Sequence, residues 1–140
     1  LRDAKVNSLP ASDVVTAVRF DGRLYFANVS YFEDAILEAV AANPKAPFLL
    51  IVADGVNEMD ASGEEVVHHI VDRLRGNGVT VVFSGLKKQV IDVMRATGLF
   101  DVITQANIFA TADQALTAIY ARAGHAEADA LRPDNMLAVG

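Results

Sequence analysis

Residues 48–74 read FLLIVADGVNEMDASGEEVVHHIVDRL, and this stretch decides the fold class. Its first part, Phe48 to Ala53, is short and wholly apolar and lies between Pro47 and Asp54, which is typical of a strand buried on both faces. Its last part carries an apolar stripe at helical spacing: Val66, Val67, Ile70, Val71 and Leu74. The stripe ends at Gly76-Asn77-Gly78, a glycine-rich stop, so the stretch predicts a buried strand, a loop and a helix.

More strands and helices are expected after and before this unit. Val79 to Phe83 repeats the wholly apolar pattern, and Val102-Ile103 with Ile108-Phe109 leaves room for a last short strand. Three further helices are predicted where apolar residues recur at helical spacing: Val29, Phe32, Ile36, Leu37 and Val40 after the candidate caps Asn28 and Ser30; Val90, Ile91 and Met94 before Gly98; and Ala115, Leu116, Ile119 and Tyr120 after the capping pattern Thr111-Ala112-Asp113-Gln114.

The N-terminal part predicts a hairpin. Residues 14–20 are rich in β-branched side chains, and Asp21-Gly22 before Leu24-Tyr25-Phe26 is a strong signal for a two-residue turn between strands. The expected order of elements is therefore β-β-α-β-α-β-α-β-α. This order predicts an α/β fold with a mostly parallel sheet and an N-terminal antiparallel hairpin, because each helical crossover returns the chain in the same direction.

Composition restricts the classes of function. A chain of 140 residues with 52% apolar side chains has the size of one domain and can bury a continuous core. The absence of Cys excludes disulfides and thiolate metal ligands, and a net charge of −6 argues against a nucleic-acid partner. No apolar run approaches the roughly 18–20 residues of a membrane helix, so we expect a soluble domain. Because the chain opens Leu-Arg-Asp without an initiator Met, we expect it to be part of a longer protein.

Two loops are expected to form the functional edge of the sheet. Ligands of parallel sheets bind beyond the carboxyl ends of the strands, where the loops 54–63 and 84–88 would meet. Ser84-Gly85-Leu86-Lys87-Lys88 gives a small basic spot beside the acidic loop that holds Asp54 and Asn57. It lacks the Gly-Lys-Ser/Thr sequence of a phosphate loop. Two interpretations stay open: an ordinary solvated helix start, or a contact for an anion or a nucleotide.

The turn Asp60-Ala61-Ser62-Gly63 is the principal candidate site. Ser62 and Glu65 form a capping-box pattern, and Gly63 permits a close approach of neighbouring backbone. The turn is either a simple helix cap or a place where Ser62 accepts a phosphoryl group, since a phosphate there meets free N–H groups and a favourable dipole. Asp60, Glu64 and Glu65 would repel that phosphate, which favours recognition by the surrounding surface over covalent modification.

Adjacent histidines follow this turn. His68 and His69 point about 100° apart on a helix, so they cannot chelate one metal ion as an i, i+4 pair would. A hydrolytic triad of Ser62, His68 and Asp60 is disfavoured because there is no Gly-x-Ser-x-Gly elbow and the nucleophile and base would lie on different helix faces. We therefore expect no metal and no enzyme activity. The histidines are expected to pair with acidic neighbours on the helix: His68 with Glu64 or Asp72, and His69 with Glu65.

Residues 56–63, VNEMDASG after an apolar strand, resemble the signature loop of the sulfate transporter and anti-sigma factor antagonist domain, abbreviated STAS. The expected element order is similar to that family's over roughly residues 13–123, which implies the STAS-like (SpoIIAA-like) fold. In the antagonist branch, the resemblance implies that the serine at position 62 is phosphorylated by a partner kinase that is itself an anti-sigma factor. Residues 20–28, followed by Tyr31-Phe32, are similar to the other branch, the cytoplasmic C-terminal domains of SulP-type anion transporters, whose second strand is aromatic and leads into an Asn-capped helix.

The resemblance to the transporter branch implies a non-catalytic regulatory domain of a SulP-type sulfate or anion transporter. It would act through protein or nucleotide contacts at the cytoplasmic face of the cell membrane, as part of an integral membrane protein. The implied partners are its own transmembrane domain and cytoplasmic regulators such as acyl carrier protein, with no nucleic acid and no cofactor apart from GTP or ATP. The alternative is a free-standing anti-sigma factor antagonist that is switched by phosphorylation of Ser62. The expected organisation is a connector from a membrane domain over residues 1–12, the STAS domain over 13–123 and a flexible tail over 124–140.

Overall fold

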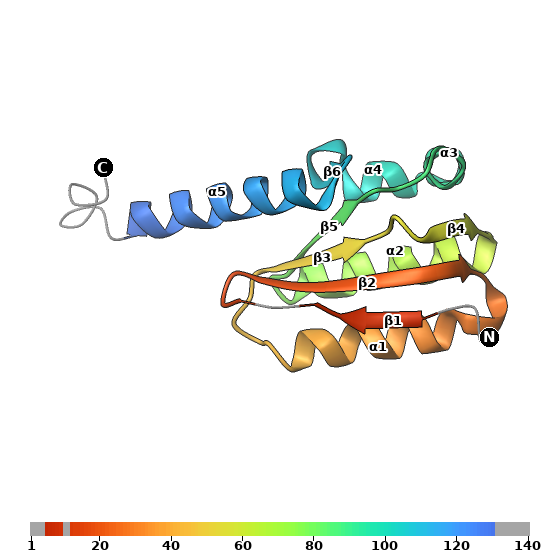
Figure 1. Ribbon diagram of the computed structural model, residues 1–140, viewed down its shortest axis with the longest axis horizontal. Helices are drawn as coiled ribbons and strands as arrows, with labels where there is room; N and C mark the ends of the chain where they lie inside the picture. Colours follow the sequence, from red (N-terminus) through yellow and green to blue (C-terminus); the bar gives the residue numbers. More distant parts are fainter. Residues whose placement is uncertain (1–4, 10–11, 131–140) are drawn as a thin grey trace.

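The computed structural model describes residues 5–9 and 12–130 and confirms the α/β fold with a mostly parallel sheet. The strands are β1 (Lys5–Ser8), β2 (Val15–Leu24), β3 (Phe48–Val52), β4 (Val56–Met59), β5 (Thr80–Ser84) and β6 (Ile108–Phe109). They form one six-stranded sheet in the order β1-β2-β3-β5-β6, with β4 paired to the end of β2 (Figure 1). Among the strand pairs of the described residues, only β1–β2 is antiparallel; the other pairs are parallel.

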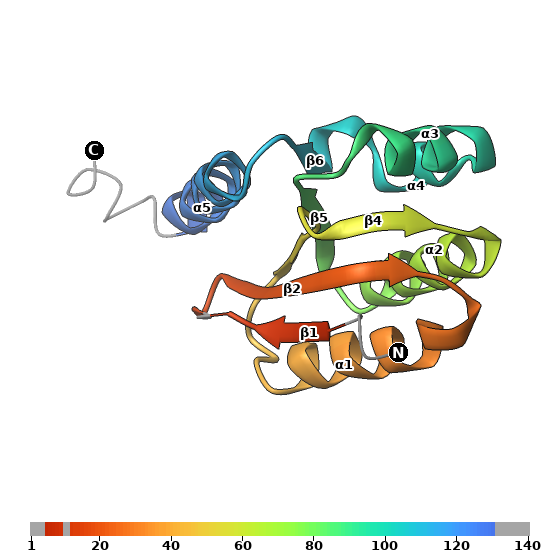
Figure 2. The same ribbon diagram turned by 45° about the vertical axis from the view of Figure 1, so that its right-hand side comes forward.

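Helices cover the two faces of this sheet unequally. They are α1 (Val29–Ala41), α2 (Ala61–Gly76), α3 (Lys88–Thr97), α4 (Leu99–Ile103) and α5 (Ala112–Ala130), with short 3-10 turns η1 (Phe26–Asn28) and η2 (Gln105–Asn107). Leu49 and Ile51 of β3 pack in the larger core cluster with α1, α2, α3 and α4, whereas Leu50 and Val52 pack in the smaller cluster under α5. This alternation explains why β3 is apolar throughout. Figure 2 shows α5 apart from α1 and α2, with strands between them.

The predicted hairpin at Asp21-Gly22 is wrong. β2 runs without reversal from Val15 to Leu24, and its register with β4 shifts between Gly22 and Arg23. Gly22 has a φ of 118°, a left-handed conformation that glycine adopts readily, but here it belongs to an irregularity of the strand. The Gly22 N–H donates to the carbonyl of Gly55 at 2.8 Å, so pairing with a distant segment overrides the local turn signal.

The antiparallel pair instead involves a strand that lies before the expected start of the fold. Lys5–Ser8 pairs with β2 in the register Lys5 opposite Asp21 and Ser8 opposite Val18. Residues 5–8 are therefore part of the sheet. The expectation that residues 1–12 form a connector ahead of the fold is wrong for these four residues. Val6, at the outer edge of β1, donates its N–H to the hydroxyl of Tyr31 on α1 at 3.0 Å. Residues 1–4 and 10–11 of the expected connector lie outside the described residues.

The remaining elements follow the sequence expectation with four differences. The strand β4 forms inside the predicted loop 54–63, where it pairs with the end of β2. Val102-Ile103 ends the helix α4, because Leu99 and Ile103 at i, i+4 spacing are both buried against the core. Tyr120 is 45% exposed, and its hydroxyl lies 2.7 Å from that of Ser12, whereas a buried side chain was expected. Helix α5 continues to Ala130, past the expected start of the tail at residue 124, and residues 131–140 lie outside the described residues.

Candidate functional site

The first turn of α2 is organised by Asp60. Its Oδ1 accepts a hydrogen bond from the Gly63 N–H at 2.9 Å, so Asp60 is the N-cap residue. Its Oδ2 accepts from the Phe26 N–H at 3.2 Å, so the same carboxylate also holds η1. The predicted cap at Ser62 is wrong by two positions: Ser62 lies inside the first turn. Asp60 takes the cap because it stands where the chain leaves β4 in an extended conformation, with φ of −97° and ψ of −174°.

Gly63 allows this turn to lie directly against β2. A Cβ at this position would be 2.4 Å from the carbonyl oxygen of Leu24 and 3.0 Å from its carbonyl carbon. The close approach expected at Gly63 is therefore real, and its partner is the end of β2. The Asp60 N–H also donates to the Leu24 oxygen, at 3.1 Å, so both residues join α2 to the sheet.

A hollow of about 380 Å³ opens between the start of α2 and the segment η1–α1. Phe26 at its rim is 77% exposed, the largest value among the big apolar side chains that are exposed in the described residues. The segment is held in place by the buried side chain of Asn28, whose Oδ1 accepts from the Tyr25 N–H at 3.1 Å and whose Nδ2 donates to the Arg23 oxygen at 2.6 Å. The lining residues are Phe26, Val29, Glu33, Ser62, Glu65, Val66 and His69.

Replacing Asp60 by Ala is expected to lower the free energy of unfolding by about 1–2 kcal/mol, since it removes the cap of α2 and the acceptor for η1. Urea denaturation measures this change, and amide exchange at Phe26 should accelerate. Asp60→Asn is the matched control, because its carbonyl can still cap Gly63 while its NH₂ group cannot accept from Phe26. Equal stability of the Ala variant and the unmodified chain would contradict this assignment.

The histidines pair with carboxylates. His68 Nε2 lies 3.3 Å from Asp72 Oδ2 one turn along α2, as expected. His69 Nε2 lies 3.5 Å from Glu33 Oε2 of α1; the predicted partner Glu65 is wrong, because the neighbouring helix supplies a carboxylate that helical spacing does not reveal. Since His68 faces Asp72 and both oxygens of Asp60 accept backbone N–H groups, the hydrolytic triad with Ser62 is not assembled. In residues 5–9 and 12–130, no cluster of three or more potential metal ligands occurs.

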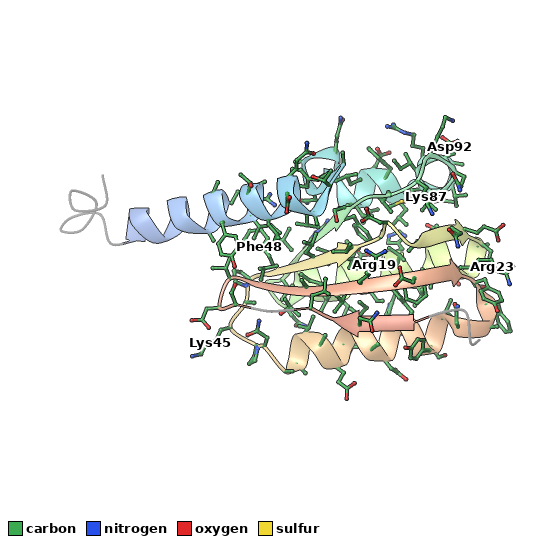
Figure 3. The ribbon with its side chains drawn as sticks, in the orientation of Figure 1. Arg19, Arg23, Lys45, Phe48, Lys87 and Asp92 are labelled. Atoms are coloured by element: carbon green, nitrogen blue, oxygen red, sulfur yellow. The ribbon has the colours of Figure 1, made fainter. Side chains whose placement is uncertain are left out.

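The two predicted loops do meet at the carboxyl ends of the strands. Lys87 Nζ donates to Asn57 Oδ1 at 2.8 Å, and a Cβ added to Gly85 would be 2.2 Å from Asp54 Oδ1. Figure 3 shows Lys87 beside α3, at the end of the molecule toward which β2 and β4 point. Lys88 points elsewhere: its Nζ donates to Asp92 Oδ2 at 3.0 Å, one turn along α3.

Ser84 directly precedes Gly85, at the start of the second loop. It is the last residue of β5 and is fully buried, and its Oγ has no hydrogen-bond partner among the described residues. Both lysines of the basic spot are engaged by neutral or acidic side chains of the chain itself. An incoming anion would therefore compete with Asn57 and Asp92 for them.

Sequence reasoning missed four residues that line the hollow: Phe26, Val29, Glu33 and His69. Phe26 was expected in a strand, and Val29 and Glu33 on a helix with no link to the turn at Asp60. The available signal was the aromatic pair Tyr25-Phe26 just ahead of Asn28. The part of the chain that the structure describes includes no helix that is both long and apolar enough to cross a membrane.

Comparisons with known proteins identify the family. The STAS domain pattern matches residues 8–115. YvdB of Bacillus subtilis (strain 168), which is named as a sulfate transporter, is 30% identical over 95 residues, or 68% of this chain and 18% of YvdB. The chain spans less than a fifth of the length of the curated relatives that it matches.

Solved structures share the fold. The STAS domain of a SulP transporter from Vibrio cholerae superposes with a TM-score of 0.64 at 19% identity, over 86% of this chain and 88% of that one. An anti-sigma factor antagonist from Mycobacterium paratuberculosis gives 0.67 at 22% identity, over 82% and 94%. Both branches thus share this arrangement of strands and helices. Since the family match covers most of the 140 residues and the fold agrees with it, the chain belongs to the STAS domain family.

Proposed function

We propose that the chain is the non-catalytic, cytoplasmic regulatory domain of a SulP-type sulfate or anion transporter. The observation that carries the proposal is the acidic hollow at Ser62. Glu33 and Glu65 line the same hollow as Ser62, and Asp60 already accepts the Gly63 N–H that a phosphate at the helix start would use. Repulsion by these carboxylates opposes the helix dipole, so Ser62 is a poor phosphorylation switch. The sequence match to a protein named as a sulfate transporter supports the same branch.

The second candidate is a free-standing anti-sigma factor antagonist. It is supported by the likeness to the Mycobacterium paratuberculosis antagonist, which the superposition covers almost completely. Ser62 is partly exposed in the first turn of α2, so a kinase could reach it. In this candidate, phosphorylation of Ser62 would control binding to the kinase.

Cell fractionation with mass spectrometry separates the two candidates. An antibody raised against the chain should detect it in the membrane fraction, within a polypeptide much longer than 140 residues. The tryptic peptide that carries Ser62 should be unmodified. A small species outside the membrane fraction, with phosphoserine at position 62, would overturn the transporter proposal in favour of the antagonist. Deleting the domain from the transporter should change sulfate uptake per transporter molecule in the membrane, and unchanged uptake would contradict a regulatory role.

Nucleotide contact at residues 84–88 stays a prediction within this proposal. The buried Ser84 hydroxyl and the Lys87–Asn57 bond place polar groups near the start of α3. Acyl carrier protein likewise stays a predicted partner. Because both proteins would be acidic, its association requires a local basic patch, and the lysines nearest the loops are engaged with Asn57 and Asp92.

A further inference from the structure

We infer that the hollow beside Ser62 binds a basic, apolar segment at the cytoplasmic end of a membrane helix of the same transporter. The inference rests on the proposed function and identifies the surface and the chemistry of the contact. An apolar side chain of that segment would lie on Phe26, Val29 and Val66. Its Lys or Arg side chains would face Glu33 and Glu65.

The apolar part of the hollow is exposed and held in place. The Phe26 side chain is 77% exposed, although its backbone N–H is bound by Asp60 and the turn is closed by Asn28. Its exposure is therefore not the result of a loose chain end. An aromatic side chain held at the rim of a hollow between two helices is typical of an interaction site, because burying it on a partner removes apolar surface from water.

The charges of the hollow select a cationic partner. Glu33 and Glu65 line it, and in the described part of the chain no Lys or Arg forms an ion pair with either residue. His69 Nε2 lies 3.5 Å from Glu33 Oε2. The Glu33 side chain is only 27% exposed, so its attraction for a cation is less screened than that of a fully solvated carboxylate. Acidic and basic surfaces of this kind determine which partners associate.

The positive-inside rule indicates where the basic, apolar partner segment comes from. Cytoplasmic loops of membrane proteins carry an excess of Lys and Arg close to the apolar ends of their helices. A domain attached to the cytoplasmic side therefore meets segments that combine a cation with an adjacent large apolar side chain. This combination matches the hollow, which is lined by aromatic and aliphatic side chains beside two carboxylates.

The first test uses the 140-residue chain and a synthetic amphipathic peptide of Leu and Lys, titrated by NMR and calorimetry. Binding should shift the resonances of Val29 and Val66. Phe26→Ala should weaken binding about tenfold, as for a central apolar contact of an interface. The double variant Glu33→Gln, Glu65→Gln should weaken it similarly. Its matched control is Asp34→Asn, Glu38→Gln, which makes the same change in net charge on exposed residues of α1 outside the hollow.

Two results of the peptide test would overturn the inference. Equal loss of affinity in the two double variants, with no effect of Phe26→Ala, would mean attraction to overall negative charge and would overturn the inference. Absence of binding would overturn it as well. A peptide of Ser and Lys should bind at least about tenfold more weakly than the Leu and Lys peptide if the apolar contact contributes as proposed.

The second test identifies the source in the full-length protein. A photo-crosslinking amino acid at position 26, activated in cells, should join the domain to a basic cytoplasmic loop of the same polypeptide. A cross-link to a separate protein, or none, would overturn the proposed source. Cell fractionation tests the proposed function independently of this inference. If the proposed function were wrong, fractionation would find the chain free of a membrane part, whatever the result of the peptide titration.

Discussion

Replacing Phe32 by Ala is expected to lower the free energy of unfolding by about 3–5 kcal/mol, the largest effect that we predict. Phe32 is 2% exposed on α1, and its ring meets that of Phe20 on β2 edge to face, with centroids 5.0 Å apart and an interplanar angle of 82°. Truncation removes this aromatic contact and leaves a cavity between helix and sheet. Urea denaturation monitored by circular dichroism measures the loss. Because α1 forms one wall of the hollow at Ser62, the variant should also bind the Leu and Lys peptide more weakly.

The adjacent residue provides the control for this prediction. Tyr31 is 46% exposed, and its hydroxyl accepts one hydrogen bond, from the Val6 N–H. Tyr31→Phe removes that bond alone and should lower stability by about 0.5–1.5 kcal/mol. The prediction fails if Phe32→Ala lowers the free energy of unfolding no more than Tyr31→Phe does. In that case the contact between α1 and the sheet is less tightly packed than the structure indicates.

Replacing Gly63 by Ala is expected to lower the free energy of unfolding by about 2–3 kcal/mol. The added Cβ would lie 2.4 Å from the Leu24 carbonyl oxygen, and this neighbour is backbone that cannot rotate away. Either the start of α2 or the end of β2 must move. Such a movement would also disturb the Asp60 bonds to Gly63 and Phe26, so amide exchange at both residues should accelerate along with the loss in urea stability.

Gly76 is the matched control for Gly63, because it lies on the same helix. A Cβ at Gly76 would meet no atom within 4 Å, and alanine is the better helix former. Gly76→Ala should therefore leave stability unchanged or raise it by about 0.4–1 kcal/mol. If Gly63→Ala behaved like Gly76→Ala, the close contact between α2 and β2 would be refuted.

Much of the fold follows from patterns within short stretches of sequence. The wholly apolar runs at Phe48 and Val79 predict buried parallel strands, and the stripes from Val29 and Val66 predict α1 and α2, because burial of one face requires the matching period. The same order of elements predicts that Asn57 and Lys87 lie at one edge of the sheet, and the 2.8 Å bond between their side chains confirms it. In these cases the local pattern and the tertiary contacts favour the same result.

The position of the turn at residues 60–63 was predicted correctly, but its contacts were not. The turn at residues 60–63 opens α2 as expected, yet Asp60 rather than Ser62 caps it. The capping-box pattern of Ser62 and Glu65 is recognised from residue type and spacing alone. Asp60 is the cap because it leaves β4 in an extended conformation, and its second oxygen also binds the Phe26 N–H, which comes from a segment 34 residues earlier in the chain.

The sequence by itself therefore determined the α/β class, the helices and parallel strands that bury periodic apolar faces, and the turn that marks the STAS family. Only the tertiary structure decided that β2 continues through Asp21-Gly22, that residues 5–8 form its antiparallel partner, and that Phe26 and Glu33 stand beside Ser62. The physical reason is the range of the interactions. Periodicity and capping depend on residues within a few turns, whereas strand pairing and the walls of a hollow depend on groups that folding brings together from distant parts of the chain.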